Sequence, residues 1–577
     1  MRNLLRYLKD YKKESVLGPL FKLLEASFEL FVPLVMAKII DIGIRNQDVG
    51  YIIKMGGILI LLGIIGLSCS LTAQYFAAKA AVGFGTSLRN ELFRHINQFS
   101  YTELDTMGTA TLITRMTSDI NQVQSGVNLV LRLFLRSPFI VFGAMVMAFT
   151  IDAKAAFIFV IAIPLLSIVV FGVMLISMPL YKKVQKQLDK ILLATRENLT
   201  GVRVIRAFNR QKDEIKNFDE SSDLLVKFQV FVGKISAALN PLTYIIINFA
   251  IIALVWIGGK QVDSGVITQG GVVALVNYMS QILVELIKLA NLIITISKSL
   301  ACANRVNTVL EKKTSMIEKT GQVITQKEDT VRVVWENVDF TYEGAKQPAL
   351  SGISFEAKKG ETIGIIGGTG SGKSTLVNLI PRFYDVTKGK ILINGVNIKE
   401  YSFSDLRDKI GVIPQKAVLF KGTVRENMRW GKKEASDEEI YQALKTAQGE
   451  EIIKQKKEGL DFLIQQEGKN LSGGQKQRFT IARALVRKPE ILIMDDSASA
   501  LDFATDAKLR KAIKENTKDM TVFIVSQRAT TIKNADKILV LDDGRLVGAG
   551  KHKELLESCE VYKEICLSQL SEKEVQN

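Results

Sequence analysis

Two short glycine-containing segments of this chain have the residue pattern of phosphate-binding loops. The first, Gly367–Thr375, fits GxxxxGK(S/T), in which glycines let backbone amides wrap around phosphate groups. In this pattern Lys373 reaches the outer phosphates of a nucleotide, and the Ser374 hydroxyl is a ligand for Mg²⁺. The second, Leu471–Arg478, reads LSGGQKQR and opens a helical pattern, where unpaired amides and the helix dipole attract anions. The first loop consists of Gly367, Gly368, Thr369, Gly370, Ser371, Gly372, Lys373, Ser374 and Thr375.

The elements that must position the first loop can be read from the residues on either side of it. Glu361–Ile366 (ETIGII) predicts a buried strand before the loop, and Leu376–Ile380 predicts the start of an apolar helix after it. Strand, loop and helix in this order are the context in which the pattern binds phosphate, which distinguishes it from an ordinary glycine-rich turn.

The two loops and the motifs around them resemble the ATP-binding cassette (ABC) ATPases over about residues 330–560. Tyr342 matches the aromatic residue that stacks on adenine, and Gln415 matches the Q-loop residue that touches Mg²⁺. Ile491–Asp495 is an apolar strand ending in a carboxylate, and Asp495 would hold Mg²⁺ through water. The resemblance therefore implies ATP and Mg²⁺ as cofactors of an ATPase coupled to transport. The matching signature residues are Leu471, Ser472, Gly473, Gly474 and Gln475, and the matching D-loop residues are Ser499, Ala500, Leu501 and Asp502.

Two positions depart from the family's pattern. Active cassettes have Glu directly after the Walker B Asp, whereas here Asp495 is followed by Asp496, which is one methylene shorter. The family has His before Arg at a strand end, whereas here Gln527 precedes Arg528, and Gln cannot carry the proton or charge of His. Because misplacing a catalytic group by about 1 Å can cost ~10²-fold in rate, this site is expected to bind ATP and hydrolyse it poorly. The chain's two histidines, His95 and His552, do not align with that position.

The composition places a membrane domain ahead of the cassette. The chain has 577 residues, of which 47% are hydrophobic and 23% charged, and the long apolar runs lie before residue 300. A soluble helical bundle would show polar faces at helical period, and residues 155–178 show none. Six spans of ~20 residues are therefore predicted, at about 16–40, 51–78, 127–150, 155–178, 236–259 and 271–297.

Basic residues flank the predicted spans unevenly. The connections after the second and fourth spans are long and basic, whereas those after the first, third and fifth are short and nearly uncharged. Both long connections and both termini are therefore expected in the cytosol, with the chain in the inner or plasma membrane. This distribution explains the net charge of +17 better than nucleic-acid binding, so no nucleic-acid partner is expected. The basic residues are Lys79, Arg89, Arg94 and Arg115, then Lys182, Lys183, Lys186, Lys190, Arg196, Arg203, Arg206 and Arg210.

Two smaller features fit a cytosolic and lipid setting. The segment MRNLLRYLKDYKK is basic and amphipathic without a cleavage site, so it predicts an interfacial helix leading into the first span. The cysteines lack the spacing of metal ligands and are expected to be free thiols. They are Cys69, Cys302, Cys559 and Cys566.

We therefore expect a multi-domain membrane protein: an all-α six-helix transmembrane domain over residues 1–300, a linker over 301–330 and an α/β P-loop ATPase domain of ABC type over 331–577. The two long connections look like the cytosolic extensions of ABC exporters. Coupling helices are expected near Tyr101–Thr114 and within Gly201–Arg210, although a solvated charged helix would have the same pattern.

One chain supplies half of what an ABC exporter uses, so the resemblance implies a half-transporter that pairs with a second one. Family cassettes dimerise head to tail, so the P-loop of one chain and the signature of the other bind one ATP. The changes at Asp496 and Gln527 favour a heterodimer whose partner carries Glu and His, and whose active site this chain's signature completes. A homodimer with slow hydrolysis and an ATP-gated channel or regulator are the alternatives. The spans argue against a soluble ABC ATPase, and the fused cassette argues against an importer.

The substrate is indicated only by residue types inside the spans. Charged residues there are costly in lipid, so they line an inward-facing cavity, sit at the membrane interface or form internal ion pairs. Aromatic and Met residues suit an adaptable apolar pocket, or equally lipid contact and core packing. Resemblance to multidrug and lipid exporters implies a hydrophobic or amphipathic small molecule. The charged residues are Lys22, Glu25, Glu29, Arg132, Arg136, Glu285 and Lys288, and the apolar ones are Phe28, Phe31, Met145, Met147 and Phe149.

Overall fold

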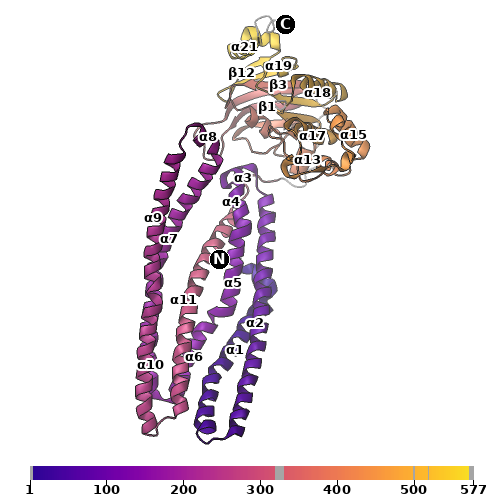
Figure 1. Ribbon diagram of the computed structural model, residues 1–577. Helices are drawn as coiled ribbons and strands as arrows, with labels where there is room; N and C mark the ends of the chain where they lie inside the picture. The colour runs from indigo at the N-terminus through magenta and orange to yellow at the C-terminus, as the bar shows by residue number, and fades with distance from the viewer. Residues whose placement is uncertain (1–3, 319–329, 498–500, 518, 571–577) are drawn as a thin grey trace. The chain divides into compact units, whose positions relative to one another are not determined.

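The long apolar runs of the first three hundred residues fold into helices, and the later residues fold into sheets covered by helices (Figure 1). The structure is a computed structural model that describes residues 4–318, 330–497, 501–517 and 519–570. It divides into two units, each described below by itself. The first holds the described residues up to Asn97 with Ala110–Lys313, and the second holds Gln98–Thr109 with the described residues from Thr314 onward.

The described residues of the first unit form helices joined by short turns. The long helices are α1 (Lys12–Lys38), α2 (Val49–Asn97), α5 (Ile120–Leu129), α6 (Arg136–Ile151), α7 (Ala153–Thr200), α9 (Gln211–Ala237), α10 (Leu239–Asp263) and α11 (Gln269–Glu311). Shorter helical segments are η1 (Leu4–Tyr11), η2 (Ile39–Ile44), α4 (Thr109–Thr114), η3 (Arg115–Asp119), η4 (Val130–Phe134) and α8 (Val202–Ala207). The predicted N-terminal helix corresponds to η1.

Five helical stretches in the described part of the chain are long and apolar enough to cross a membrane. They are Val49–Asn97, Thr109–Ile151, Ala153–Thr200, Gln211–Asp263 and Gln269–Glu311. The predicted first span lies in α1, which packs along α2 and α11 and carries three of the charged residues named above. The helical transmembrane domain is therefore confirmed. The last helix, α11, continues to Glu311, past the predicted boundary at residue 300, and residues 319–329 of the predicted linker lie outside the described residues.

Small residues let α1 and α2 approach closely. Ala73, Ala77 and Ala80 on α2 are fully buried, and a Cβ added to Gly18 on α1 would lie 3.3 Å from the backbone nitrogen of Ala77. Such contacts are typical of helices in lipid, where close backbone packing replaces the hydrophobic effect. Cys69, Cys302, Cys559 and Cys566 are buried, and none of them forms a disulfide among the described residues.

The second unit has the predicted α/β architecture, built on a six-stranded sheet in the order β12-β11-β3-β10-β9-β6. Neighbours from β11 to β6 pair in parallel, and β12 pairs antiparallel to β11. A four-stranded antiparallel sheet has the order β2-β1-β4-β5. The strands are β1 (Val331–Phe340), β2 (Leu350–Lys358), β3 (Thr362–Gly367), β4 (Lys388–Ile393), β5 (Val396–Asn397), β6 (Ile410–Ile413), β7 (Gly422–Thr423), β8 (Leu463–Ile464), β9 (Ile491–Asp495), β10 (Thr521–Val525), β11 (Lys537–Asp542) and β12 (Arg545–Gly550).

Helices cover these sheets, and one short helix from the first half of the sequence joins them. This helix is α3 (Tyr101–Met107), which belongs to the second unit together with the rest of Gln98–Thr109, whereas the chain on either side of that segment belongs to the first. The others are α12 (Lys373–Leu379), α13 (Phe403–Asp408), α14 (Val424–Arg429), α15 (Asp437–Thr446), α16 (Glu450–Lys454), η5 (Gly459–Asp461), η6 (Gln466–Gly468), α17 (Gly473–Val486), α18 (Phe503–Asn516), α19 (Ala529–Ile532), α20 (His552–Ser558) and α21 (Glu560–Leu567).

The parallel strands are buried on both faces. In β9, Ile491 and Ile493 join the core shared with the four-stranded sheet, whereas Leu492 and Met494 join the core beneath the helices. Apolar residues at every position are typical of central parallel strands. Because the strands are parallel and in register, the carboxyl ends of β3, β10, β9 and β6 meet along one edge, where ligands bind in open α/β sheets.

Candidate functional site

The carboxyl edge of the sheet brings together the residues that the sequence singled out. The P-loop follows β3, Gln527 follows β10, Asp495 ends β9, and Gln415 follows β6. Since β10 lies between β3 and β9, the P-loop, Gln527 and the acidic pair lie on three adjacent strands. Residues separated by more than a hundred positions thus form one site.

The P-loop leads from β3 into α12 through left-handed turns. Gly370 and Gly372 have φ values of 85° and 93°, a region that favours glycine. The Lys373 ammonium donates to the carbonyl oxygens of Gly367 and Gly368 at 2.9 and 2.6 Å, so the lysine folds back over the loop. Burial lowers the pKa of Lys373, while the nearby Asp496 and Asp495 carboxylates act in the opposite direction.

Oxygen ligands suited to Mg²⁺ lie beside this loop. The Ser374 hydroxyl donates to a carboxylate oxygen of Asp495 at 3.0 Å. A hydroxyl and a carboxylate are hard ligands of the kind that Mg²⁺ binds next to nucleotide phosphates. Burial raises the pKa of Asp495, and the adjacent Asp496 carboxylate adds to this effect. A bound cation would offset both the burial of the Asp495 charge and its repulsion from Asp496, so the donor set fits magnesium.

Asp496 occupies a strained turn at the end of β9. Its φ is 43°, and its backbone N–H donates to the carbonyl oxygen of Val525 on β10 at 3.0 Å. The Gln415 amide nitrogen donates to the Asp496 carboxylate at 3.4 Å. The Q-loop residue and the residue in place of the family's Glu are therefore joined directly.

Gln527 lies at the end of the neighbouring strand with its side chain exposed. Its backbone carbonyl accepts a hydrogen bond from the Gln569 amide at 2.8 Å, and the Gln569 oxygen accepts from the Ala529 N–H at 2.9 Å. Gln569 thus holds the backbone of the switch position from the far end of the chain. No motif marked this residue in the sequence.

Tyr342 contacts α12, the helix that follows the P-loop. Its hydroxyl is 3.0 Å from the Thr375 hydroxyl, and its ring meets Tyr384 edge-on at 5.4 Å between centroids. This half-buried ring also meets Phe340 edge-on, with centroids 4.8 Å apart. Its stacking on adenine stays a prediction.

The signature forms the N-terminus of α17. Ser472 caps the helix: its hydroxyl accepts from the Gln475 N–H at 3.3 Å, while the Gln475 side chain accepts from the Ser472 N–H at 3.0 Å. Leu471 is buried, and a Cβ added to Gly473 would have no atom within 4 Å. None of the hydrogen bonds among the described residues joins this segment to the P-loop of the same chain.

The structure describes two of the four D-loop residues. Ser499 and Ala500 lie outside the described residues. Leu501 is buried, and Asp502 caps α18 by accepting a hydrogen bond from the Thr505 N–H at 2.8 Å.

The helix α3 lies within the segment predicted as the first coupling helix and contacts the ATPase residues. The Tyr101 ring stacks on Phe383 with centroids 4.5 Å apart, and the Tyr384 hydroxyl donates to the Asp105 carboxylate at 2.6 Å. Buried Glu103 accepts from the Ser315 N–H at 2.9 Å. In the second predicted segment, α8 forms in the first unit and is followed by Phe208, whose side chain is exposed.

Most charged residues of the predicted spans form ion pairs inside the first unit. Arg136 on α6 contacts Glu285 on α11 and Glu29 on α1, each at 2.7 Å. Lys288 pairs with Glu285 at 2.9 Å. The structure shows internal pairing for these groups, and Glu29, Glu285 and Lys288 also line a cavity of about 520 Å³. Among the remainder, Lys22 pairs with Glu25, Arg132 donates to Gln74, and Met145 and Met147 pack against the bundle core.

Sequence comparison places these features among known proteins. Residues 15–286 match the family described as ABC transporter transmembrane region, and residues 350–499 match the family described as ABC transporter. The chain is 37% identical over 569 residues to YfiB of Bacillus subtilis, an uncharacterized ABC transporter ATP-binding protein, covering 99% of this chain and 98% of that one.

A second relative and a solved structure extend this result. YgaD of Bacillus subtilis, provisionally named a multidrug export ATP-binding/permease protein, is 31% identical over 577 residues, covering 98% of each chain. The structure of a bacterial Atm1-family ABC exporter with ATP bound has the same fold, with a TM-score of 0.79, 23% identity and coverage of 97% of this chain and 99% of that one. This chain therefore belongs to the ABC transporter family, with the transmembrane region and the ATP-binding domain on one polypeptide.

Proposed function

We propose that this chain is one subunit of an ATP-driven ABC exporter that moves hydrophobic or amphipathic compounds out of the cytosol. The fusion of a transmembrane region to a cassette supports this proposal, as do relatives that are provisionally named for export. Both termini and the second unit would lie in the cytosol, and α3 would transmit changes at the nucleotide site to the membrane helices.

The observation that carries the finer proposal is the pair Asp496 and Gln527 on adjacent strands. Both follow the carboxyl ends of adjacent strands, at the same edge of the sheet as the P-loop, so they would act on one ATP. The shorter Asp496 side chain leaves the attacking water farther from its base, and Gln527 supplies no proton or charge. The site on this chain's Walker motifs would hold ATP and hydrolyse it slowly.

An intact signature beside an impaired site favours a heterodimer. The capping box fixes Ser472 at the N-terminus of α17, no hydrogen bond among the described residues joins this segment to the chain's own P-loop, and a side chain at Gly473 would meet no atom within 4 Å. These groups would close over ATP held by a partner half-transporter that carries Glu and His. The site that turns over would then combine this chain's signature with the partner's Walker motifs.

The first experiment measures ATP hydrolysis by this chain purified alone in lipid nanodiscs. We expect tight ATP binding with slow turnover, and we expect Asp496→Glu combined with Gln527→His to raise turnover by about 10²-fold. Asp543→Glu is the matched control, because Asp543 also has a positive φ of 42° and lies in an exposed turn. Fast hydrolysis together with uphill transport by the unmodified chain would contradict the heterodimer and support a homodimer.

A second experiment tests the partner directly. A neighbouring reading frame that encodes a half-transporter with Asp-Glu and His would be co-expressed with this chain. We expect the pair to co-purify and to hydrolyse ATP, and Ser472→Arg in this chain to abolish that activity. Retention of full activity by this variant would show that the partner's site does not use this signature. Ion currents without uphill movement of substrate would instead indicate an ATP-gated channel.

A further inference from the structure

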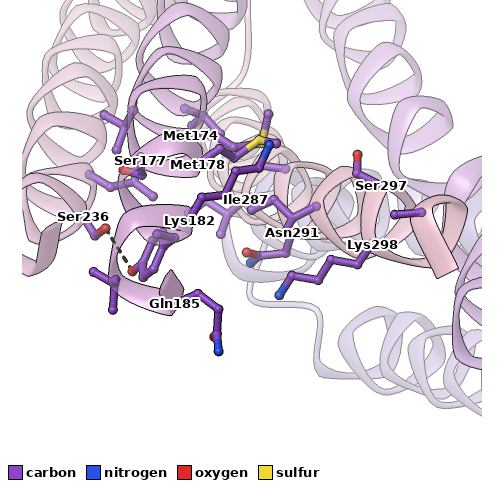
Figure 2. A pocket seen from close by; sticks show the side chains of 18 residues that line it. Met174, Ser177, Met178, Lys182, Gln185, Ser236, Ile287, Asn291, Ser297 and Lys298 are labelled. Atoms are coloured by element: carbon purple, nitrogen blue, oxygen red, sulfur yellow. Dashed lines mark hydrogen bonds between the residues drawn. The ribbon is translucent and has the colours of Figure 1, made fainter. Parts of the chain in front are cut away.

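A cavity of about 810 Å³ lies inside the first unit, between α7, the junction of α9 and α10, and α11. One part of its wall is apolar and includes Val170 and Met174 from α7 and Ile287 and Ile294 from α11. Figure 2 shows side chains of α7 and α11 facing each other across this space, with Ser236 closing one side. The Tyr181 hydroxyl lies 3.3 Å from the Ser236 hydroxyl and joins α7 to α9.

Polar residues gather at one end of the cavity. Lys182 and Gln185 extend from α7, and Ser297 and Lys298 extend from α11 (Figure 2). Lys182 and Lys298 lie just beyond the predicted cytosolic ends of their spans, near residues 178 and 297. The apolar part of the cavity therefore lies at the depth of the inner-leaflet chains, and the polar part lies at the depth of the headgroups.

The charge at the polar end is positive. The described lining residues include two lysines and no Asp or Glu. Lys182 and Lys298 are exposed, and neither forms an ion pair with a described residue. Other basic residues of the first unit, such as Arg136 and Arg305, do pair with carboxylates. Two ammonium groups at headgroup depth attract an anion.

A buried hydroxyl between the two ends has an unused hydrogen-bonding group. Ser177 is 6% exposed, lines the cavity, and its hydroxyl has no hydrogen-bond partner among the described residues. Asn291 lies across from it on α11 (Figure 2). A buried polar group without a partner costs stability, so this position favours a ligand that has a polar linkage at the junction of its head and tail.

We propose that this cavity binds an inner-leaflet lipid with an anionic headgroup, and that such amphiphiles are the substrate class of the exporter. The headgroup lies between Lys182 and Lys298, the ester linkage reaches Ser177, and the acyl chain follows the apolar wall. The claim that such lipids are the substrate rests on the proposed export function. The claim that they bind here rests on the cavity alone.

Native mass spectrometry of the full chain in a non-ionic detergent tests the binding site. The protein is titrated with dimyristoyl phosphatidic acid and, separately, with dimyristoyl phosphatidylcholine, which has the same chains and no net charge. We expect one phosphatidic acid to bind with at least tenfold higher affinity. Equal binding of the two lipids would overturn the proposal.

Charge-matched variants separate a specific site from general attraction to basic protein. Lys182→Gln with Lys298→Gln should weaken phosphatidic acid binding by roughly 30-fold, because each lysine near the membrane surface contributes about fivefold. The control is Lys183→Gln with Lys186→Gln, which removes two exposed charges from α7 that do not line the cavity. Ser177→Ala should weaken binding by about fivefold. Equal losses in the control pair would contradict the site.

The binding assay contains no ATP, so a negative result there would contradict the lipid site and leave the export proposal untested by it. Loss of the lipid site would leave the nucleotide experiments unaffected. If binding is confirmed, the same variants are reconstituted with the partner in vesicles that contain labelled phosphatidic acid. Binding without ATP-dependent movement of the lipid would show a bound lipid that is not the substrate.

Discussion

At the scale of single residues, Asp495 shows how a ligand site can destabilise the protein that carries it. Its carboxylate is buried beside Asp496, and its pKa is raised above the ordinary value of 3.8. A raised pKa means that the charged form is disfavoured in the folded chain relative to the unfolded chain. The resulting loss of stability begins as the pH rises past about 3.8 and is complete above the folded pKa.

We therefore expect Asp495→Asn to raise the midpoint of thermal unfolding at pH 7 in the absence of nucleotide. The gain should vanish below about pH 3, where Asp495 is protonated in both the folded and the unfolded state. The same variant should lose the stabilisation that MgATP gives the unmodified protein, because the magnesium ligand is gone. Asp408→Asn, at a side chain 68% exposed, is the control. A lower midpoint for Asp495→Asn at neutral pH would contradict this account.

The residues that carry chemistry could be predicted because each motif encodes its own local geometry. The P-loop pattern requires glycine where φ is positive, and Gly370 and Gly372 have such angles. Gln569 and Tyr384 could not be predicted, because their importance comes from contacts with residues distant in sequence. A side chain that holds another residue's backbone leaves no pattern in one sequence.

At the scale of elements, α3 packs against the aromatic residues beside the candidate adenine site. The Tyr384 ring lies edge-on to Tyr342, and its hydroxyl donates to Asp105 on α3. Burial raises the pKa of Tyr384 and the Asp105 carboxylate adds to this, so the hydroxyl remains a donor at all physiological pH values. One side chain thus contacts both the candidate adenine site and the proposed coupling helix.

We expect Tyr384→Phe to leave ATP affinity within about twofold and to lower the amount of substrate moved per ATP hydrolysed. The reason is that the ring contacts with Tyr342 remain while the hydrogen bond to the Asp105 carboxylate is lost, a change of about 1.5–3 kcal/mol. Tyr401→Phe is the control, since the Tyr401 hydroxyl is also buried and donates to the Ile393 carbonyl at 2.9 Å. An unchanged ratio of transport to hydrolysis in Tyr384→Phe would exclude this route of coupling.

Element boundaries followed the sequence most closely in the ATPase unit. The strand predicted over Glu361–Ile366 is β3, one residue later at each end, and the apolar run Ile491–Asp495 is β9 with the same bounds. The membrane helices extend well past the predicted spans, because hydropathy marks only the part that lipid covers. The π-helical segments η2, η3 and η4 have no distinct composition and could not be predicted.

At the scale of the whole molecule, one arginine joins three helices of the transmembrane unit. Arg136 is buried and pairs with carboxylates on α1 and α11, and Ser137 donates to the second oxygen of Glu285 at 2.8 Å. Removing one partner of a buried pair leaves an uncompensated charge and typically costs about 3–5 kcal/mol. The sequence showed charges at helical spacing, but their partners depend on how the helices pack.

We expect Arg136→Met to lower the thermal unfolding midpoint in detergent and to reduce the folded protein in membranes. Adding Glu285→Gln should recover much of the loss, because the orphaned carboxylate is then neutral. Arg132→Met is the control: Arg132 lies one helical turn earlier, forms no ion pair with a described residue, and reaches only the Gln74 side chain at 3.5 Å. Equal destabilisation by both substitutions would show that side-chain volume matters here and that pairing does not.

Gly368 in the P-loop and Gly473 in the signature have a consequence for how this sequence tolerates change. Neither has a positive φ, and a side chain at either would meet no atom of its own chain within 4 Å. Folding alone therefore does not require glycine at these positions, and Ala would suit the start of α17 better. A library of single substitutions sorted by folded protein should keep Ala at both positions, whereas one sorted by transport should lose it. The difference between the two libraries would outline the surface that nucleotide and partner subunit occupy.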